Sequence, residues 1–185
     1  MIPRWPALLC ILLAGPAAAQ VEDNDQTIAY YSRLTTGILA GGEHGLITGT
    51  ATTIHGISVG HLAVGAGVGI EGYERWRTVP IFGSLTYFLK DARASGMFLQ
   101  INAGHSVCRL IVPDEGFQVD GTRGGFMFST VAGYQIAAGK LLVNLSAGYK
   151  LQNMRGAYKN GQLPNLNFTL DEQADRFVFQ IGVGL

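Results

Sequence analysis

The last ten residues of this chain alternate between two kinds of side chain, and this alternation limits the possible folds more than any other feature. Successive side chains of a β-strand point to opposite faces, so the segment is a strand with one apolar face. The same alternation recurs over residues 97–106 and 141–152. The apolar row of the last segment contains Phe177, Phe179, Ile181, Val183 and Leu185, and the other row contains Arg176, Val178, Gln180, Gly182 and Gly184.

The composition indicates which of the two faces meets water. Charged residues make up 14% of the chain, against roughly 25% for an ordinary soluble domain. A soluble antiparallel sheet would cover its outer face with charge, but here most charged residues fall between the strand candidates. Small neutral side chains suit a narrow interior, and an uncharged outer face suits lipid. The sequence therefore predicts a barrel with its apolar rows turned outward into a membrane.

Eight segments alternate in this way, and several reach the nine to eleven residues that a tilted strand needs to cross an outer membrane. The predicted fold class is all-β, an eight-stranded antiparallel up-and-down transmembrane β-barrel. Short connections alternate with longer polar ones, of which residues 153–175 form the last, as expected for periplasmic turns and external loops. The predicted strands are residues 33–41, 51–59, 61–72, 78–89, 97–107, 123–136, 141–152 and 176–185.

The first residues indicate export. Arg4 precedes an apolar run over residues 7–14, and small residues follow at 16–19, which is the pattern of a signal peptide cleaved after Ala19. The predicted organisation is a signal peptide (1–19), a short periplasmic segment (20–32) and an outer-membrane β-barrel domain (33–185). Cys108 is then the only cysteine, which excludes an internal disulfide and a cysteine-based metal site. The formal charge is close to zero, so no attraction to nucleic acid is expected.

Glycine and aromatic spacings carry a family resemblance. The segments are Gly-Ile-Leu-Ala-Gly at 37–41, the glycine-rich run at 56–70, Val-Pro-Ile-Phe at 79–82 and Asn-Ala-Gly-His at 102–105. Over residues 35–185 the chain resembles the small outer-membrane β-barrel family common in Bacteroidota, related in architecture to the OmpA membrane domain and to OmpX-like and OmpW-like barrels. It departs from outer-membrane proteins in ending on Leu185 rather than on an aromatic residue.

The resemblance implies a bacterial outer-membrane protein without enzymatic activity, with a structural role or a surface-binding role through its external loops. It also implies four kinds of partner: outer-membrane lipids, lipopolysaccharide, the outer-membrane assembly machinery and periplasmic chaperones. The motifs are spacings rather than catalytic signatures, so they predict no catalytic residue and no cofactor. What the external loops bind is left open.

Arginines are predicted to gather at the external rim of the barrel. Guanidinium groups pair well with phosphates, which lipopolysaccharide carries, and His105 continues the outward row at the upper end of its strand. The competing interpretation is a solvated rim, since isolated surface charges contribute little. The predicted lipopolysaccharide or headgroup contacts are Arg75, Trp76, Arg77, His105, Arg109 and Arg123.

Inward rows of small residues predict a polar plug rather than a pore, because eight strands enclose little space. Gly65, Gly67 and Gly69 would leave room for larger polar side chains opposite. Glu71, Lys150 and Arg176 fall on inward rows, and His55 is expected to face across the lumen. These placements are predicted from parity alone, that is, from which of the two alternating rows of its strand each residue belongs to.

Two other functions are weighed against this reading. An outer-membrane lipid A-modifying enzyme, of the deacylase or acyltransferase type, would need a histidine beside a hydroxyl, but the adjacent His105 and Ser106 point to opposite faces. A soluble lipocalin-like carrier would need an internal ligand cavity. The Gly67-x-Gly69-x-x-Gly72 spacing matches a dinucleotide motif by letter only, because no helical pattern follows it.

Overall fold

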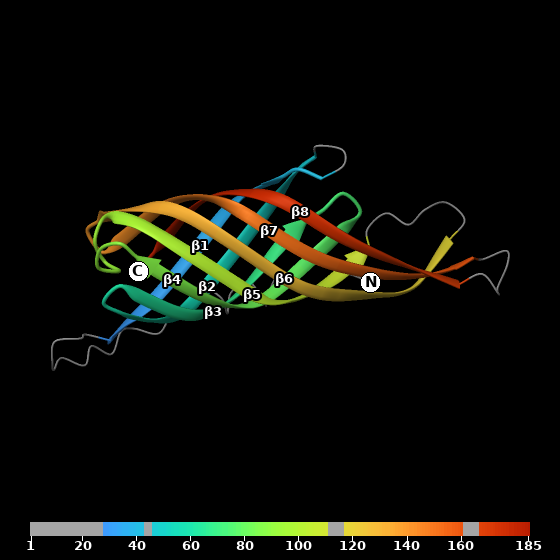
Figure 1. Ribbon diagram of the computed structural model, residues 1–185, viewed down its shortest axis with the longest axis horizontal. Coiled ribbons are helices and arrows are strands. Elements are labelled where there is room, and N and C mark those ends of the chain that lie inside the picture. The colour runs from blue at the N-terminus through green and yellow to red at the C-terminus, as the bar shows by residue number, and fades with distance from the viewer. Residues whose placement is uncertain (1–27, 43–45, 111–116, 161–166) are drawn as a thin grey trace, which may run out of the picture.

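The computed structural model describes residues 28–42, 46–110, 117–160 and 167–185, and it confirms the predicted all-β, eight-stranded antiparallel barrel. Each strand pairs with the next in the chain, and β8 pairs with β1 to close the ring (Figure 1). Within these residues there is no helix long and apolar enough to cross a membrane. The strands are β1 (Ile28–Ala40), β2 (Ile47–Val59), β3 (Leu62–Gly72), β4 (Trp76–Phe88), β5 (Gly96–Leu110), β6 (Phe117–Ala138), β7 (Leu141–Asn160) and β8 (Asn167–Gly184).

The two ends of the barrel differ. At the end that we call the turn end, short connections join β2 to β3, β4 to β5 and β6 to β7, and the C-terminus lies at the same end (Figure 1). At the opposite, extended end, β6, β7 and β8 project beyond the other strands. These three strands contain 22, 20 and 18 residues, while the other five contain 11 to 15.

Several predicted strand boundaries differ from the structure, and two of the differences have clear physical reasons. Residues 153–175 were expected to form the last external loop, but most of them continue β7 and β8, which pair as far as Lys159 and Asn167. Their outward side chains, such as Asn153, Arg155, Asp171 and Gln173, are polar, so the outward apolar row stops although the backbone ladder continues. β1 begins at Ile28 rather than at residue 33, because residues 28–32 pair with residues 55–59 of β2. The predicted signal peptide and residues 20–27 lie outside the described residues.

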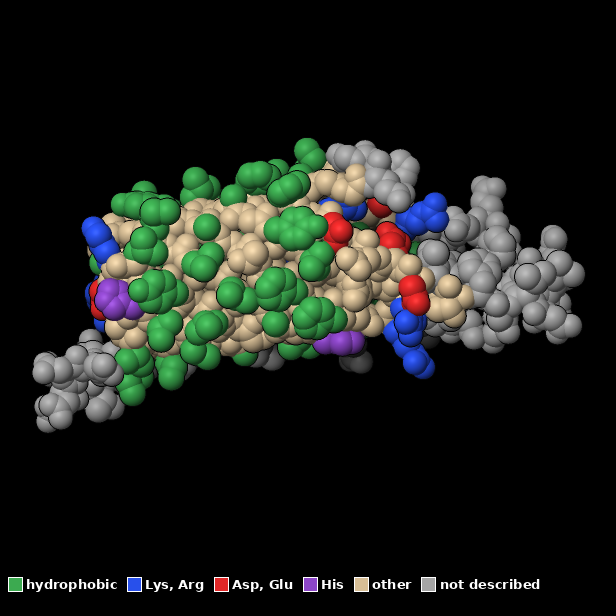
Figure 2. Space-filling view, viewed as in Figure 1, with side chains coloured by type: hydrophobic (Ala, Val, Ile, Leu, Met, Phe, Trp, Pro, Cys, Tyr) green, Lys and Arg blue, Asp and Glu red, His purple; other side chains and the backbone are tan. Residues whose placement is uncertain are grey.

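Side chains alternate around the barrel as the apolar rows predicted. The outward rows expose large hydrophobic side chains on all eight strands, for example Ile101 at 39%, Leu145 at 67% and Phe177 at 60%. Figure 2 shows these side chains spread over the middle of the visible face, with charged side chains gathered toward the two ends. The inward rows are buried. The barrel is therefore apolar on the outside around its middle.

The interior is filled by two apolar clusters. One cluster joins aromatic side chains such as Phe88 and Phe98 to Ile54 and Met127, and the other includes Leu39, Trp76, Cys108 and Val178. Buried polar side chains from most strands lie among these clusters. The predicted polar plug is thus only half right, because aromatic and aliphatic side chains fill much of the lumen.

Glycines on the inward rows allow this packing. A Cβ atom built on Gly104 would lie 2.1 Å from the Ile81 carbonyl oxygen and 2.6 Å from the Phe82 Cα atom. Both of these atoms belong to the backbone of β4, so a side chain at this position would have to displace a whole strand. Small residues opposite large ones let an eight-stranded barrel close around a filled interior.

Candidate functional site

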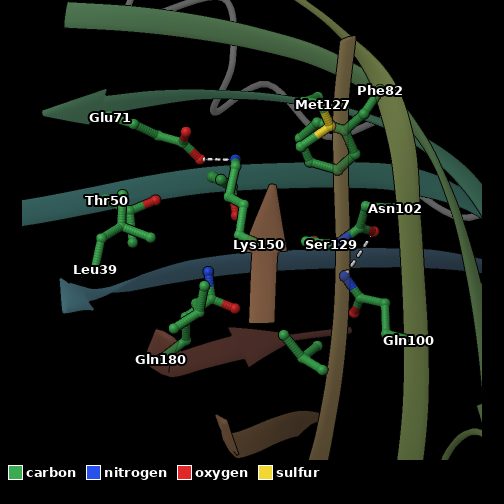
Figure 3. Close-up of a pocket in the computed structure, with 13 residues that line it drawn as sticks. Leu39, Thr50, Glu71, Phe82, Gln100, Asn102, Met127, Ser129, Lys150 and Gln180 are labelled. Atoms are coloured by element: carbon green, nitrogen blue, oxygen red, sulfur yellow. Dashed lines mark hydrogen bonds and ion pairs between the residues drawn. The ribbon is translucent and has the colours of Figure 1, made fainter. Parts of the chain in front are cut away.

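The lumen contains one small polar cavity lined by residues of several strands (Figure 3). It measures about 20 Å³, which is enough for about one water molecule. Glu71 on β3 and Lys150 on β7 point toward each other across it and form an ion pair, with side chains 2% and 5% exposed. This part of the lumen is therefore filled by side chains, apart from that space.

Glu71 is the centre of a buried polar group. Besides Lys150, its carboxylate accepts hydrogen bonds from the Tyr73 hydroxyl at 3.2 Å and the Thr78 hydroxyl at 3.4 Å. Tyr73 lies in the connection between β3 and β4, where burial, and then the charge of Glu71, raises the pKa of its phenol. These contacts confirm the inward placement of Glu71 and Lys150, and they join β3, β4 and β7 across the lumen.

A second buried network crosses the lumen from Arg33. Its guanidinium donates to the Gln100 Oε1 atom at 2.8 Å and lies 4.1 Å from the centre of the Phe98 ring. Gln100 donates to Asn102 at 2.9 Å, and Asn102 donates to Ser129 at 3.0 Å. Residue parity alone did not single out Arg33 as a lumen residue.

The predicted rim residues occupy two different faces. Arg77 on β4, Arg109 on β5 and Arg123 on β6 are exposed on the outside near the extended end, and Arg75 is exposed in the β3–β4 connection. Trp76 is fully buried and donates from Nε1 to the Glu172 Oε2 atom at 2.9 Å. The prediction of a headgroup contact is therefore wrong for Trp76, which faces the lumen.

Four exposed arginines, which include one further member, Arg155 on β7, form two cross-strand pairs. Arg77 is the cross-strand partner of Arg109, and Arg123 is the partner of Arg155. Arg155 binds Asp171 on β8 through two hydrogen bonds, and this contact raises the pKa of Arg155. Across residues 28–42, 46–110, 117–160 and 167–185, no ion pair involves the other three. We call Arg77, Arg109, Arg123 and Arg155 the arginine row.

A groove of about 510 Å³ opens beside this row on the outside of β6, β7 and β8. Its outward lining comes from Arg123, Phe126, Asn153, Arg155, Asp171 and Gln173, all of which are exposed. The groove lies where β6 carries a bulge between Gly124 and Met127. The sequence reasoning missed this groove, because it placed residues 153–175 in a loop.

The histidines are distributed differently from the prediction. His105 is exposed on the outward row of β5, as expected, and Ser106 is buried on the other face. His55 was expected in the lumen but lies on the outward row of β2. Its Nδ1 atom is 2.6 Å from the Tyr30 hydroxyl and its Nε2 atom is 3.0 Å from the Thr53 hydroxyl. Histidine and threonine two residues apart on one strand share a face, which is the signal that would have found this cluster.

The described residues contain no group of three or more His, Cys, Asp or Glu side chains that could hold a metal ion. Cys108 is buried, 2% exposed, and lies 3.4 Å from the Ser106 hydroxyl. His44 falls outside the described residues. The candidate sites on the outer face are therefore the arginine row with its groove, and the cluster of His55, Tyr30 and Thr53.

Comparison with known proteins supports the fold. No family model and no curated protein matches the sequence. The structure is similar to the crystal structure of Neisserial surface protein A (NspA), with a TM-score of 0.56 and 12% sequence identity. The match covers 84% of this chain and 95% of that protein. At this identity the likeness shows that the two chains share the small eight-stranded barrel fold.

Proposed function

We propose that this protein is an integral bacterial outer-membrane barrel without enzymatic activity, exported by a cleaved signal peptide, with a structural or surface-binding role at its extended end. The observation that carries the proposal is the continuous band of exposed apolar side chains around all eight strands. A band of this kind is stable in hydrocarbon and would cause aggregation in water. The fold shared with a surface protein of Neisseria supports the same placement.

The filled lumen supports a structural or binding role over transport. A cavity of about 20 Å³ holds about one water, so the barrel passes no solute of metabolite size in this state. The same observation weighs against the soluble lipocalin-like carrier, since the cavity among the described residues has no room for an apolar ligand.

The arginine row supports contact with lipopolysaccharide at the outer leaflet. Arg77 and Arg109 are exposed on the outside, beyond Val107, which still belongs to the apolar band. Like charges directly opposite each other on one face of a sheet repel, and an anion placed between them removes that cost. Phosphates at the level of the headgroups supply this anion. Among the predicted contacts, Arg75, Arg77, His105, Arg109 and Arg123 keep exposed positions that suit this role.

Membrane integration is tested by fractionation and by electrophoresis without boiling. We expect the protein in the outer-membrane fraction, extracted only by detergent, with faster gel migration when unheated because the closed barrel stays compact. The purified protein in planar bilayers should give no porin-like conductance steps. A protein that stays monodisperse in buffer without detergent would contradict the proposal.

One contact favours a second candidate, a lipid-modifying hydrolase. Thr53, His55 and Tyr30 form a chain of hydroxyl, imidazole and phenol on the outward face, and a hydroxyl paired with an imidazole is the arrangement of an activated nucleophile. Mass spectrometry of lipid A and phospholipids from cells carrying the wild type, His55→Ala and His105→Ala tests this candidate. Identical acylation patterns in all three strains would remove it.

A further inference from the structure

We propose that the groove on β6, β7 and β8 binds the phosphorylated sugar headgroup of a glycolipid of the outer leaflet, with Arg123 on a phosphate and Asn153, Asp171 and Gln173 on the sugar. This inference rests on the proposed membrane placement and adds a specific site to it. It assigns the groove one occupant, a phosphorylated glycolipid.

The shape of the groove is built by the β6 bulge. Gly124 pairs with Met154 and Met127 pairs with Gln152, so Gly125 and Phe126 stand opposite the single residue Asn153. A Cβ atom on Gly125 would lie 2.7 Å from the Asn153 carbonyl oxygen, and one on Gly124 would lie 1.3 Å from the Ser106 carbonyl oxygen. Two glycines thus keep the bulged strand close to its neighbours, and the concavity is part of the sheet rather than of a loop.

The charge of the groove favours a phosphate on one side. Arg155 is already neutralised by Asp171, whereas Arg123 has no ion pair within the described part of the chain and faces Arg155 across the ladder. The other acid of the lining, Glu172, accepts from the buried Trp76 Nε1 atom. The unsatisfied group at the groove is therefore the Arg123 guanidinium, whose planar donors match the oxygens of a phosphate.

The remaining polar side chains favour a sugar beside that phosphate. Asn153 and Gln173 are cross-strand partners, so their amides lie next to each other on the outer face. Amides donate and accept at once, and the Asp171 carboxylate accepts only, so together they match hydroxyl groups, which do both. Gln173 Nε2 donates to the Asp175 Oδ1 atom at 3.4 Å, which leaves the Gln173 carbonyl oxygen and the Asn153 amide for the hydroxyl groups of a sugar.

The position of the groove favours a lipid over a soluble sugar phosphate. Phe126 on the groove wall is 55% exposed, and on the turn-end side of the groove the Tyr149 and Phe177 rings pack together on the outer face at 5.7 Å. A headgroup held by Arg123 would lay its acyl chains along these apolar side chains. The groove also opens outward, so its ligand comes from the bilayer and not from the lumen.

The test uses the full-length mature protein in an uncharged detergent, with native mass spectrometry and with Trp76 emission as readouts. Trp76 is the only tryptophan after residue 19, and its Glu172 partner lines the groove. The probes are diphosphorylated lipid A, monophosphorylated lipid A and phosphatidylglycerol. We expect the diphosphorylated lipid to bind most tightly, the monophosphorylated form to bind more weakly, and phosphatidylglycerol to bind weakest because it lacks the sugar.

Two groove variants and one control decide the assignment. Arg123→Gln should lower the affinity for diphosphorylated lipid A about tenfold, the usual effect of losing one charge-assisted hydrogen bond. Gln173→Leu should lower the affinity for lipid A without changing the affinity for phosphatidylglycerol. Arg93→Gln makes the same change at the turn end and should bind like the wild type. Equal affinity of wild type and Arg123→Gln, an equal loss in Arg93→Gln, or equal binding of phosphatidylglycerol and lipid A would overturn the site. Faster gel migration of the unheated protein shows a folded barrel whether or not the groove binds lipid. A groove that binds no lipid is therefore distinguishable from a wrong proposed function.

Discussion

Close contact between strands depends on single glycines, and the two faces of the barrel tolerate different residues. At Gly104 the space for a side chain is taken by the backbone of β4. At Gly83, on the outward row of the neighbouring strand, the nearest atom to an added Cβ is the Ala103 carbonyl oxygen at 3.9 Å. Two glycines that are almost opposite each other in the ladder therefore have opposite constraints.

This difference predicts opposite results for one substitution. Gly104→Val should lower the free energy of unfolding by at least about 1–3 kcal/mol, the usual cost of overpacking, or prevent assembly. Gly83→Val is the matched control and should change stability little, because its side chain points outward into open space. Urea unfolding in vesicles, followed by the loss of fast gel migration, measures both. Equal effects at the two positions would contradict the assignment of faces.

The buried ion pair of Glu71 and Lys150 gives a second prediction for single residues. Lys150→Met leaves the Glu71 carboxylate buried without its cation, so we expect a loss of about 3–5 kcal/mol. In the double variant Glu71→Gln with Lys150→Met no buried charge is left alone, and stability should return most of the way to that of the wild type. The same unfolding assay checks this, and an additive loss in the double variant would show that the pair is not coupled.

Parity explains both the correct and the wrong residue assignments. Glu71, Lys150 and Arg176 were placed inward because they fall on the rows of small or polar side chains. Trp76 and His55 were misplaced because a large aromatic ring was expected outside and a polar ring inside, whereas the structure keeps the parity of each strand and buries the tryptophan. Parity is set by the backbone, so it outweighs the chemistry of one side chain.

The longest strands consist of two parts. Near the turn end their outward side chains are apolar, and toward the extended end the same face carries Asn153, Arg155 and Asp171. The sequence predicted the number, order and type of the strands because the apolar part alternates clearly. It missed the part with a polar outward row, and with it the groove, because a strand whose outward side chains are polar lacks the outward apolar row, although its backbone hydrogen bonds are the same.

The position of the lipid boundary along β5 gives a prediction for this element. Ile101 lies in the middle of the strand and Val107 lies two residues before Arg109, both on the outward row. Ile101→Arg should cost about 2–4 kcal/mol and Val107→Arg about 0–1 kcal/mol, since the cost of a cation facing lipid falls from the midplane to the interface. Unfolding in vesicles compares the two variants. Equal costs would show that the outward face does not meet a bilayer.

At the scale of the whole molecule, the proposed membrane placement predicts which end faces the medium. An even number of strands puts the short turns and the C-terminus at one end, which in outer-membrane barrels is the periplasmic end. Cys108 is buried, so it should stay unlabelled in the folded protein. In the proposed mature protein, which lacks Cys10 because residues 1–19 are removed, no other cysteine competes for the label.

A single introduced cysteine therefore permits a test of orientation in intact cells. Glu74→Cys, in the exposed β3–β4 connection at the extended end, should react with a maleimide that cannot cross the outer membrane. Lys140→Cys, in the turn between β6 and β7, should react only after the membrane is permeabilised. The reverse pattern would mean that the barrel is inserted with the extended end toward the periplasm.

The pairing of β8 with β1 has a consequence for biogenesis. Arg33 meets Gly184, and Ser32 exchanges two backbone hydrogen bonds with Leu185, so the ring shuts through contacts between residues about 150 positions apart. Contacts so distant in the chain form slowly, and until they form, two strands offer bare edges to any neighbour. We therefore expect a copy truncated before β8 to expose the edges of β1 and β7 and to aggregate unless a chaperone covers them.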